Sequence, residues 1–437
     1  MLKIKNIFSF LSHNFSAILF ILIPYSLVFS IFLTEIIFII LTFLSLKKNH
    51  FKLKKLFLKN NIIKMISIFY FIILFSSIYN QSEFEIILKN LAYIRFIFYA
   101  ISISFVLDEF KHLKKYFLYS LLSCYLLLFF GSIYEFMLKK YCIFFDESSI
   151  ANFTSEFPLC SKKYFIGNLI RPDRISSFFG DEMVLGSYTA RILPLVCFLI
   201  FNQFENSDKK IFIFCFIVFI STSIILLSGE RVSLFYLLIF LAIILIYINI
   251  KYKNLLYIVL ILSSFCIIYF SPVLKDRIYN QTYSQIFKQE GSIKFFSIEH
   301  QSHAISALKV FKDNILIGVG PKNYRYECRK EKYNTSIFSC TSHPHNFYIQ
   351  LLSETGLLGF LIPLFFLGNI IKFFLKNLYI RTLYKKNNAE FNDIFFYTSF
   401  LISLFPIIPT GNIFNNWLSI IFYLPLGFFI HSKKKND

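Results

Sequence analysis

A histidine–asparagine pair stands at the head of a long apolar run in the segment Ser342–Phe360, SHPHNFYIQLLSETGLLGF. A histidine can take up or release a proton near neutral pH, because its unperturbed pKa is about 6.5. Pro344 fixes its own φ and Asn346 can cap a first turn, so we expect a membrane-spanning helix that begins at about His345. His345 is therefore the first candidate for chemistry.

Helical spacing puts His345 on one stripe with Ile349, Leu352, Gly356 and Gly359. The two glycines would let another helix approach closely. We expect His345 to lie at the mouth of the resulting seam.

Glu354 falls on the opposite face of this expected helix, roughly 13 Å deeper than His345 at 1.5 Å per residue. Direct pairing of the two side chains is thereby excluded. Because a carboxylate inside a membrane is costly, we expect Glu354 to have a partner elsewhere, either Arg95 or a backbone group.

Three further polar segments stand near the ends of apolar runs, and they are Arg171–Gly186, Ser228–Arg231 and Gly318–Tyr324. The stretch His303–Asp313, ahead of the last of them, has the apolar spacing of an amphipathic helix that lies on the membrane. A single arginine at a span end more often snorkels to the interface, so no segment is specific alone.

Taken in order, these segments resemble the bacterial O-antigen ligase and O-antigen polymerase family. The family signature is His-Asn, nine residues, Gly, two residues and Gly, and His345, Asn346, Gly356 and Gly359 match it in full.

The other segments extend the resemblance to roughly residues 165–425. They resemble the family's arginine-containing loop (Arg171, Arg174), its Ser/Gly/Arg motif (Arg231) and its Gly-x-Gly-x-x-Asn-aromatic element (Gly318, Gly320, Asn323).

The resemblance implies transfer of a glycan from a polyprenyl (undecaprenyl) diphosphate carrier to an acceptor hydroxyl on the periplasmic side. Guanidinium groups at headgroup depth suit a diphosphate leaving group, because they keep their charge and bind it bidentately. Arg231 is the first candidate for this role and Arg174 the second, with Arg171 and Lys322 as supporting charges.

His345 is the candidate base for the acceptor hydroxyl. His303, Asn323 and Asn346 complete the expected substrate site. We expect no metal and no cofactor, since the chain has no Asp-x-Asp pair and the resemblance implies a metal-independent, inverting reaction. The loop Pro409–Asn416 has no carboxylate, where some ligases use an acidic residue, so acceptor recognition is left open.

The composition is that of a membrane protein, since 56% of residues are hydrophobic and 60 are Phe. The net charge of +20 lies mostly in short loops, where lysines hold loops on the cytoplasmic side, and no nucleic-acid-binding module is found. The first apolar run meets the second without a cleavage site, so we expect no cleaved signal peptide.

We therefore expect an all-α polytopic integral membrane protein of about twelve transmembrane helices, resembling the GT-C class of membrane glycosyltransferases. Residues 1–437 would form one transmembrane domain of the bacterial inner membrane. Both termini would be cytoplasmic, and the site would face the periplasm. The expected spans are 15–32, 34–46 (after a turn near Thr34 and Glu35), 62–79, 86–107, 116–137, 184–201, 211–227, 232–250, 255–271, 346–371, 394–408 and 417–430.

Two long loops, 138–183 and 272–344, are expected to be periplasmic. Each contains two cysteines, and an oxidising compartment favours disulfides. We predict the pairs Cys142–Cys160 and Cys328–Cys340.

The acceptor stays open between lipid A core (a ligase), a carrier-linked repeat unit (a polymerase) and protein. Other expected partners are membrane lipids and the polyprenyl-diphosphate-linked donor, with no nucleic acid. The competing class is a transporter or flippase of the same glycolipid, which would carry polar groups near the midplane on broken helices. A non-catalytic assembly scaffold is a further alternative.

Overall fold

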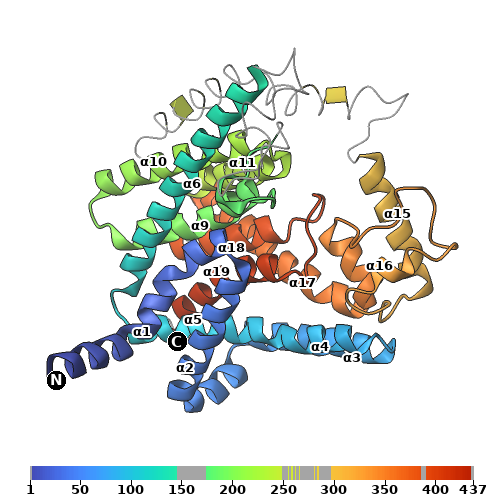
Figure 1. Cartoon of the computed structure of the whole chain (residues 1–437), viewed down its shortest axis with the longest axis horizontal. Coiled ribbons are helices and arrows are strands. Elements are labelled where there is room, and N and C mark those ends of the chain that lie inside the picture. The colour runs from blue at the N-terminus through green and yellow to red at the C-terminus, as the bar shows by residue number, and fades with distance from the viewer. Residues whose placement is uncertain are drawn as a thin grey trace, which may run out of the picture.

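A computed structural model of the chain describes residues 2–144, 174–248, 297–384 and 390–434, with isolated positions between 254 and 284. The described residues are helical and contain no β-strand, which confirms the all-α class for that part of the chain (Figure 1). The helices are α1 (Leu2–Phe29), α2 (Ile31–Lys59), α3 (Asn61–Tyr79), α4 (Phe84–Leu91), α5 (Arg95–Glu109), α6 (Leu113–Phe144), α9 (Leu185–Gln203), α10 (Ser207–Ser228), α11 (Arg231–Tyr247), α15 (Ile298–Asp313), α16 (Tyr324–Glu327), α17 (Phe347–Tyr384), α18 (Phe391–Ser403) and α19 (Asn416–Lys434), with short 3-10 turns at Ala92–Ile94 and Ser177–Phe179.

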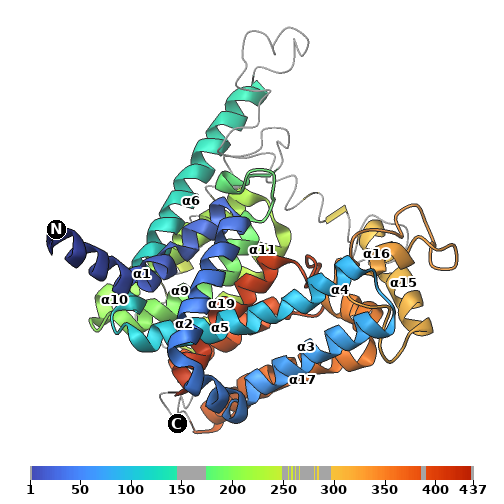
Figure 2. The same ribbon diagram turned by 60° about the horizontal axis from the view of Figure 1, so that its bottom comes forward.

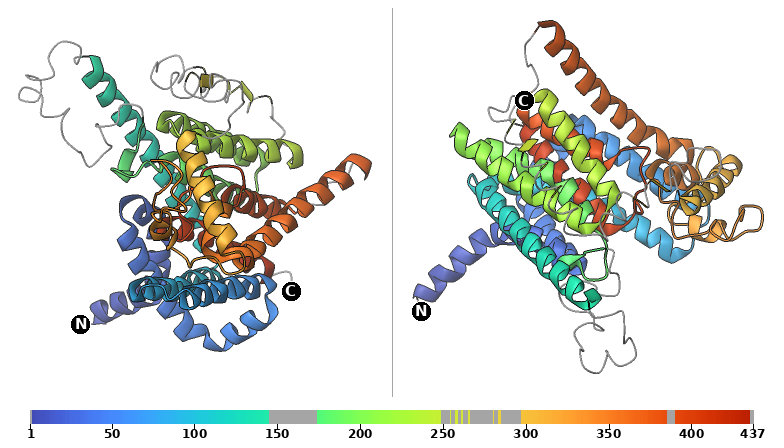
Figure 3. Two further views of the ribbon diagram at one scale, coloured as in Figure 1. Left: turned by 90° about the vertical axis from the view of Figure 1, so that its right-hand side faces the viewer. Right: turned by 90° about the horizontal axis from the view of Figure 1, so that it is seen from above.

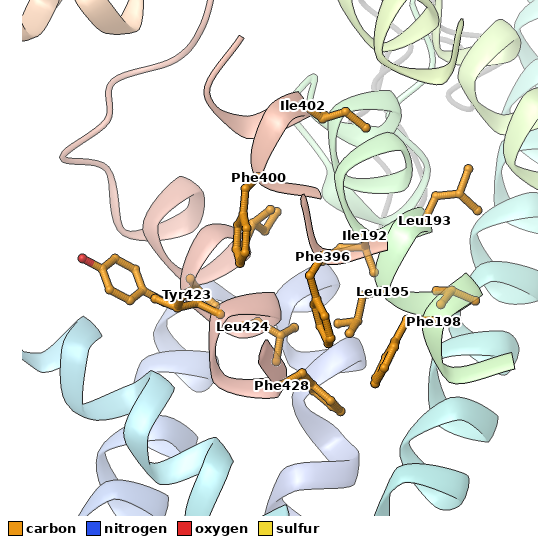
Figure 4. Packing of buried hydrophobic residues seen from close by; sticks show 14 of the residues in the cluster. Ile192, Leu193, Leu195, Phe198, Phe396, Phe400, Ile402, Tyr423, Leu424 and Phe428 are labelled. Carbon is orange, nitrogen blue, oxygen red and sulfur yellow. The ribbon is translucent and has the colours of Figure 1, made fainter. Parts of the chain in front are cut away.

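Helix α9 lies at the centre of the bundle. It packs against α10, α18 and α11, and 83% of its apolar window is buried, against 33% for α17 at the edge. Its Phe198 ring centroid lies 4.4 Å from that of Phe396, and Phe428 joins the same aromatic group (Figure 4). Such closely packed rings leave little freedom to move, so α9 has a fixed position in the bundle.

Six helices of the described chain are long and apolar enough to cross a membrane. Five further predicted spans coincide with α1, α2, α11, α18 and α19, and the predicted span 255–271 falls almost entirely outside the described residues. A polytopic membrane protein is therefore supported, and the count of twelve stays a prediction. The six helices or helix pairs are Asn61–Tyr79, Phe84–Glu109, Leu113–Lys139, Leu185–Gln203, Asp208–Ser228 and Phe347–Leu383.

One expected helix boundary is wrong. The break between α1 and α2 falls at Ser30, whose Oγ accepts from the amide of Leu33, so Thr34 and Glu35 lie inside the first turns of α2. The expected span 86–107 lies within one apolar stretch, Phe84–Glu109, in which the 3-10 turn Ala92–Ile94 joins α4 to α5 directly before Arg95.

Gly356 interrupts α17, and the predicted continuous stripe with Gly359 is therefore wrong. Its φ is +62°, a left-handed value that favours glycine, and a Cβ there would overlap the backbone of Leu316 and Ile317. The amide of Leu357 donates to the Ile315 carbonyl over 2.8 Å. The neighbour that approaches is thus a loop segment rather than the expected second helix.

Gly318 makes the same close approach from the other side. Its φ is +69°, and a Cβ there would overlap the backbone of Glu354 and Thr355. The amides of Val319 and Gly320 donate to the carbonyls of Ser353 and Glu354 over 3.0 and 2.9 Å. The loop segment 315–320 therefore pairs with α17 on both sides of its break.

Helices α3 and α4 brace this segment from behind, and Figure 2 shows α3 and α17 side by side. Ser76 Oγ donates to the Ile317 carbonyl over 2.7 Å, and Asn80 Nδ2 donates to the Gly318 carbonyl over 3.0 Å. Asn323 Nδ2 donates to Ser82 Oγ over 2.7 Å. The segment is therefore held between α17 on one side and the end of α3 on the other.

A disulfide and a buried tyrosine hold the second long loop together. Cys328 and Cys340 form a disulfide with their Cα atoms 5.1 Å apart, and Tyr324 Oη donates to the carbonyls of His303 and Ser339. Helix α15 begins at Ile298, earlier than the expected His303, and packs against α17 (Figure 3). The predicted pair Cys142–Cys160 lies outside the described side chains.

We predict that Gly356→Ala destabilises the protein by about 1–3 kcal/mol or more, because it forces a left-handed residue against a backbone that cannot move away. Gly368→Ala is the matched control, since Gly368 lies in the same helix with nothing within 4 Å of an added Cβ. Thermal unfolding of the purified protein in detergent measures both. Equal unfolding temperatures for the two variants would contradict the close approach.

Candidate functional site

The loops that join the helices at one end of the bundle surround a cavity of about 980 Å³. They come from the α1–α2 turn, the segment before α9, the α10–α11 turn, α15, the α16 region, the start of α17 and the loop before α19. Five basic side chains line it against two acidic ones, so among described residues it attracts anions. The basic residues are Lys89, Arg174, Arg191, Lys322 and Arg325, and the acidic ones are Glu182 and Glu230.

Four imidazoles form one group at this cavity. The ring centroid of His345 lies 4.1 Å from that of His343, 5.2 Å from His300 and 5.3 Å from His303. Burial, reinforced by the neighbouring imidazoles, lowers the pKa of His345 to about 3 and that of His343 to about 4. His345 is therefore neutral at physiological pH and can accept a proton.

The backbone around His345 is fixed by its neighbours. Asn346 caps α17, since its Oδ1 accepts from the amides of Tyr348 and Ile349 over 3.0 and 3.1 Å. The helix thus begins at Phe347, and the expected start at His345 is wrong. His345 instead has a φ of +55°, and its carbonyl accepts from the Thr410 amide over 2.8 Å.

Lys322 is a second non-glycine residue with positive φ (+68°) that lines the cavity. Sparsely populated backbone conformations of this kind gather at functional sites, where surrounding contacts hold them in place. Burial lowers the pKa of Lys322 to about 8, with Lys89 and Arg95 acting in the same direction. Lys322 is still mostly charged at neutral pH.

The last loop, before α19, is tied to the first turns of α17. Asn346 Nδ2 donates to the Pro406 carbonyl over 2.7 Å. Gln350 Nε2 donates to Asn412 Oδ1 over 2.9 Å, and Gln350 Oε1 accepts from the Ile413 amide over 3.2 Å. Asn346, expected to bind substrate, therefore holds the backbone in place.

Glu354 is fully buried and accepts from Gln350 Nε2 over 2.9 Å and from the Tyr324 amide over 3.3 Å. Of the two expected partners, the backbone group is observed. Arg95 pairs instead with Glu35 (Nε to Oε2, 3.0 Å) and donates to Asn416 Oδ1 over 2.9 Å. Both charges thus position the loops that frame the cavity.

Arg174 is positioned by α6 and α11. Lys139 donates to the Arg174 carbonyl, and Glu135 Oε2 accepts from the amides of Ser176 and Ser177 over 3.0 and 2.7 Å. The Arg174 guanidinium donates to the Met183 carbonyl over 2.7 Å and lies 3.7 Å from Glu230 Oε1.

Glu230 joins three of the cavity elements. Its carboxylate accepts from the amides of Gly186 and Ser187, over 2.9 and 3.1 Å, at the N-terminus of α9, and from Ser233 Oγ over 2.8 Å in α11. A carboxylate at a helix N-terminus satisfies amides that have no partner within the helix. Glu230 therefore fixes Arg174 relative to both helices.

Arg231 lies at the rim of the cavity. Its side chain is exposed, while its neighbours Glu230 and Val232 line the cavity. Burial is the main cause of the lowered pKa of His300, Glu299 acts in the opposite direction, and the charge of Arg231 lowers it further. The guanidinium therefore lies within electrostatic reach of the imidazole group.

The structure brings most of the predicted site together. His345, Arg174 and Lys322 line the cavity, and the ring of His303 lies behind His345. Asn323 is not among the lining residues, and its Nδ2 donates to Ser82 Oγ and to the Val319 carbonyl. Arg171 lies outside the described residues.

Sequence reasoning missed Arg191, Arg325 and Glu230. The strongest available signal was Arg191, a charge inside the predicted span 184–201, where intramembrane ionisable residues are rare and functional. Although four imidazoles gather here, no group of three or more His, Cys, Asp or Glu residues in the described chain has the arrangement of a metal site.

Residues 216–364 match a family model described as O-antigen ligase. The match runs from α10 to the first half of α17 and includes Arg231, the glycine segment 318–320 and His345. None of the curated proteins matches the chain.

Acidification should destabilise the protein through the imidazole group. The unfolded histidines bind protons below about pH 6.5, whereas His343 and His345 do so in the fold only near pH 4 and 3. The unfolded state thus binds more protons between those limits, so the free energy of unfolding decreases as the pH is lowered through that window. We predict a thermal midpoint in detergent roughly 5 °C or more lower at pH 5.0 than at pH 7.5.

His343→Gln removes one of these groups and should reduce the drop between the two pH values. His112→Gln, which replaces an exposed histidine outside the cavity, is the control and should keep the full drop. A midpoint in His343→Gln that falls as far as in the unsubstituted protein would contradict this account.

Proposed function

We propose that this chain is a membrane glycosyltransferase of surface polysaccharide (O-antigen) biosynthesis, and the match of residues 216–364 to a family model described as O-antigen ligase supports the proposal. Its donor is a glycan on a polyprenyl diphosphate carrier, and its acceptor is the hydroxyl of lipid A core or of a second carrier-linked glycan. One observation carries the proposal, namely a neutral, half-buried imidazole at a cavity whose charged lining residues are mainly basic.

The basic residues bind the diphosphate. Arg174, Lys322 and Arg325 line one cavity with His345, and Arg231 stands at its rim. Guanidinium groups bind phosphate oxygens bidentately and stabilise the charge that develops as the diphosphate leaves. Arginines in this role take the place of a divalent ion, which gives a metal-independent reaction.

His345 acts as the base. The acceptor oxygen attacks the anomeric carbon, the bond from that carbon to the diphosphate oxygen breaks, and the hydroxyl proton passes to the imidazole. Attack opposite the leaving group inverts the anomeric centre. Burial and the neighbouring imidazoles lower the pKa of His345, and an anionic diphosphate bound beside it would raise that pKa and make the imidazole a stronger base.

The cavity faces the periplasm in this proposal, and both chain termini are cytoplasmic. The disulfide Cys328–Cys340 supports this orientation, because it lies in the loop that contributes Lys322 and Arg325 and disulfides persist in oxidising compartments. The competing transporter would need a polar path onward through the bundle. The pocket that adjoins the cavity on its inner side is instead apolar.

Complementation of a deletion strain tests the function. We predict that the unsubstituted gene restores long O-antigen on lipid A core, whereas His345→Ala and Arg231→Ala lower transfer by about 10²-fold or more while still accumulating in the membrane. Lys330→Ala, an exposed residue of the same loop, is the control and should restore fully.

The product that accumulates in the deletion strain separates the two activities. Single repeats on lipid A core identify a polymerase, and long chains left on the carrier identify a ligase. Normal surface glycan from both His345→Ala and Arg231→Ala would overturn the proposal.

A further inference from the structure

A groove of about 510 Å³ lies between α2 and the start of α5, two helices that pack against each other (Figure 2). Most of its lining residues are apolar, and two of them, Ile39 (54%) and Phe43 (67%), are well exposed. Exposed apolar side chains on a helix of membrane-spanning length are the surface that meets lipid tails. The groove is therefore open to the hydrocarbon of the membrane.

The groove follows the half of α2 that is remote from the polar cavity. Ile31, at the start of α2, lines that cavity, whereas Lys47 lines the groove about 24 Å further along the helix. From Ile39 to Lys47 the groove covers roughly 12 Å of helix, close to the ~15 Å of hydrocarbon in one leaflet. Its length thus suits a lipid chain of the leaflet opposite the cavity, which is cytoplasmic in the proposed orientation.

The polar groups at the inner end of the groove are already paired. Each nitrogen of the Arg95 guanidinium donates to a described acceptor, namely the carbonyl of Ala92, the carboxylate of Glu35 or the amide oxygen of Asn416. Tyr99 Oη donates to Glu35 Oε2 over 2.7 Å. A hydrocarbon tail suits this end better than a polar head, because no hydrogen-bonding group there awaits a ligand.

The opposite end of the groove carries a positive charge. No described carboxylate pairs with the Lys47 ammonium, whereas that of the adjacent Lys48 pairs with Glu109. Lys47 is also the first of six lysines in the stretch 47–59, which contains no Asp or Glu. Lysine clusters next to a spanning helix attract anionic lipid headgroups. The charge of this end therefore matches a phosphate.

Thr42 supplies an independent observation inside the groove. Its Oγ1 is buried and has no hydrogen-bond partner among the described residues. Thr34 and Ser45 of the same helix instead donate to the carbonyls four residues earlier, over 3.0 and 2.5 Å. Because buried hydroxyls are nearly always paired, the Thr42 hydroxyl is suited to a ligand oxygen. It lies about 7.5 Å deeper along the helix than Lys47, on the side where the ester carbonyls of a phospholipid follow its phosphate.

We propose that this groove binds an anionic phospholipid of the leaflet opposite the polar cavity. Its phosphate pairs with Lys47, one ester carbonyl accepts from the Thr42 hydroxyl, and an acyl chain fills the apolar part up to Arg95. The bound lipid would brace α2 against α5 and, through Arg95, the cavity residue Asn416. The inference is independent of the proposed function, since a chain without transferase activity could bind the same lipid.

Native mass spectrometry of the purified full-length protein in detergent measures the first lipid bound during titration with phosphatidylglycerol and, separately, with phosphatidylcholine. We expect phosphatidylglycerol to bind about fivefold more tightly, and Lys47→Gln to remove this preference, because one lysine near the headgroups contributes roughly that factor. Lys64→Gln, which replaces an exposed lysine of α3 outside the groove, is the control and should keep the preference.

A diether analogue of phosphatidylglycerol, which has no ester carbonyl, tests the role of the threonine. Thr42→Val should weaken binding of the diester lipid about two- to tenfold and leave the diether lipid unchanged, because only the diester offers an acceptor. Thr382→Val, at an exposed position outside the groove, is the control and should bind both lipids as the unsubstituted protein does.

Equal binding of phosphatidylglycerol and phosphatidylcholine to the unsubstituted protein would overturn the inference. A preference that survives in Lys47→Gln, or equal losses of diester and diether lipid in Thr42→Val, would overturn it too. Undecaprenyl phosphate that displaces phosphatidylglycerol with the same dependence on Lys47 would assign the groove to the carrier and thus also contradict it. Glycan transfer that depends on His345 would in each case leave the proposed function standing.

Discussion

The site depends on one backbone crossing. The loop segment 315–320 runs against α17 where Gly356 breaks it, and the two segments come so close that neither Gly318 nor Gly356 has room for a Cβ. Four backbone hydrogen bonds join the segment to α17 on both sides of the break. Because Lys322 and Arg325 follow this segment directly, the crossing places two basic residues next to the imidazole that precedes α17. Because the atoms that a Cβ would meet at Gly318 and Gly356 belong to the backbone, no neighbouring side chain can move aside to make room for it.

Buried carboxylate and amide side chains fix the other loops in place by hydrogen bonds. Glu354 ties the start of α16 to α17, Glu230 ties Arg174 to the N-terminus of α9, and Gln350 ties α17 to the loop before α19. Each of these groups bonds to backbone amides or to a neighbouring loop, which holds loops from distant parts of the chain around one cavity. Among the described residues, the cavity presents basic side chains, the Thr410 hydroxyl and neutral imidazoles, the kinds of group that a diphosphate and a hydroxyl would use.

Much of this arrangement follows from local sequence. Apolar runs predicted most helices, the His-Asn signature located the candidate base, and the cysteine spacing predicted the pair Cys328–Cys340. The role of the glycines did not follow, because spacing cannot distinguish a helix that packs on a Gly stripe from a loop that crosses a helix break. The pairing of Arg95 with Glu35, and the position of Arg191 between two pockets, depend on which helices become neighbours, and a single sequence does not encode that locally.

The central claim is that the imidazole segment lines a cavity open to the outer side of the membrane. The variant Ser342→Cys tests this claim, because Ser342 is exposed, lines the cavity and lies beside His343. In intact spheroplasts, we expect a membrane-impermeant maleimide to label this variant above the unsubstituted background and to stop glycan transfer. Phe51→Cys, at an 84% exposed position in the lysine-rich part of α2, should be labelled only after the membrane is opened. Labelling of Ser342→Cys that also waits for permeabilisation would contradict the account.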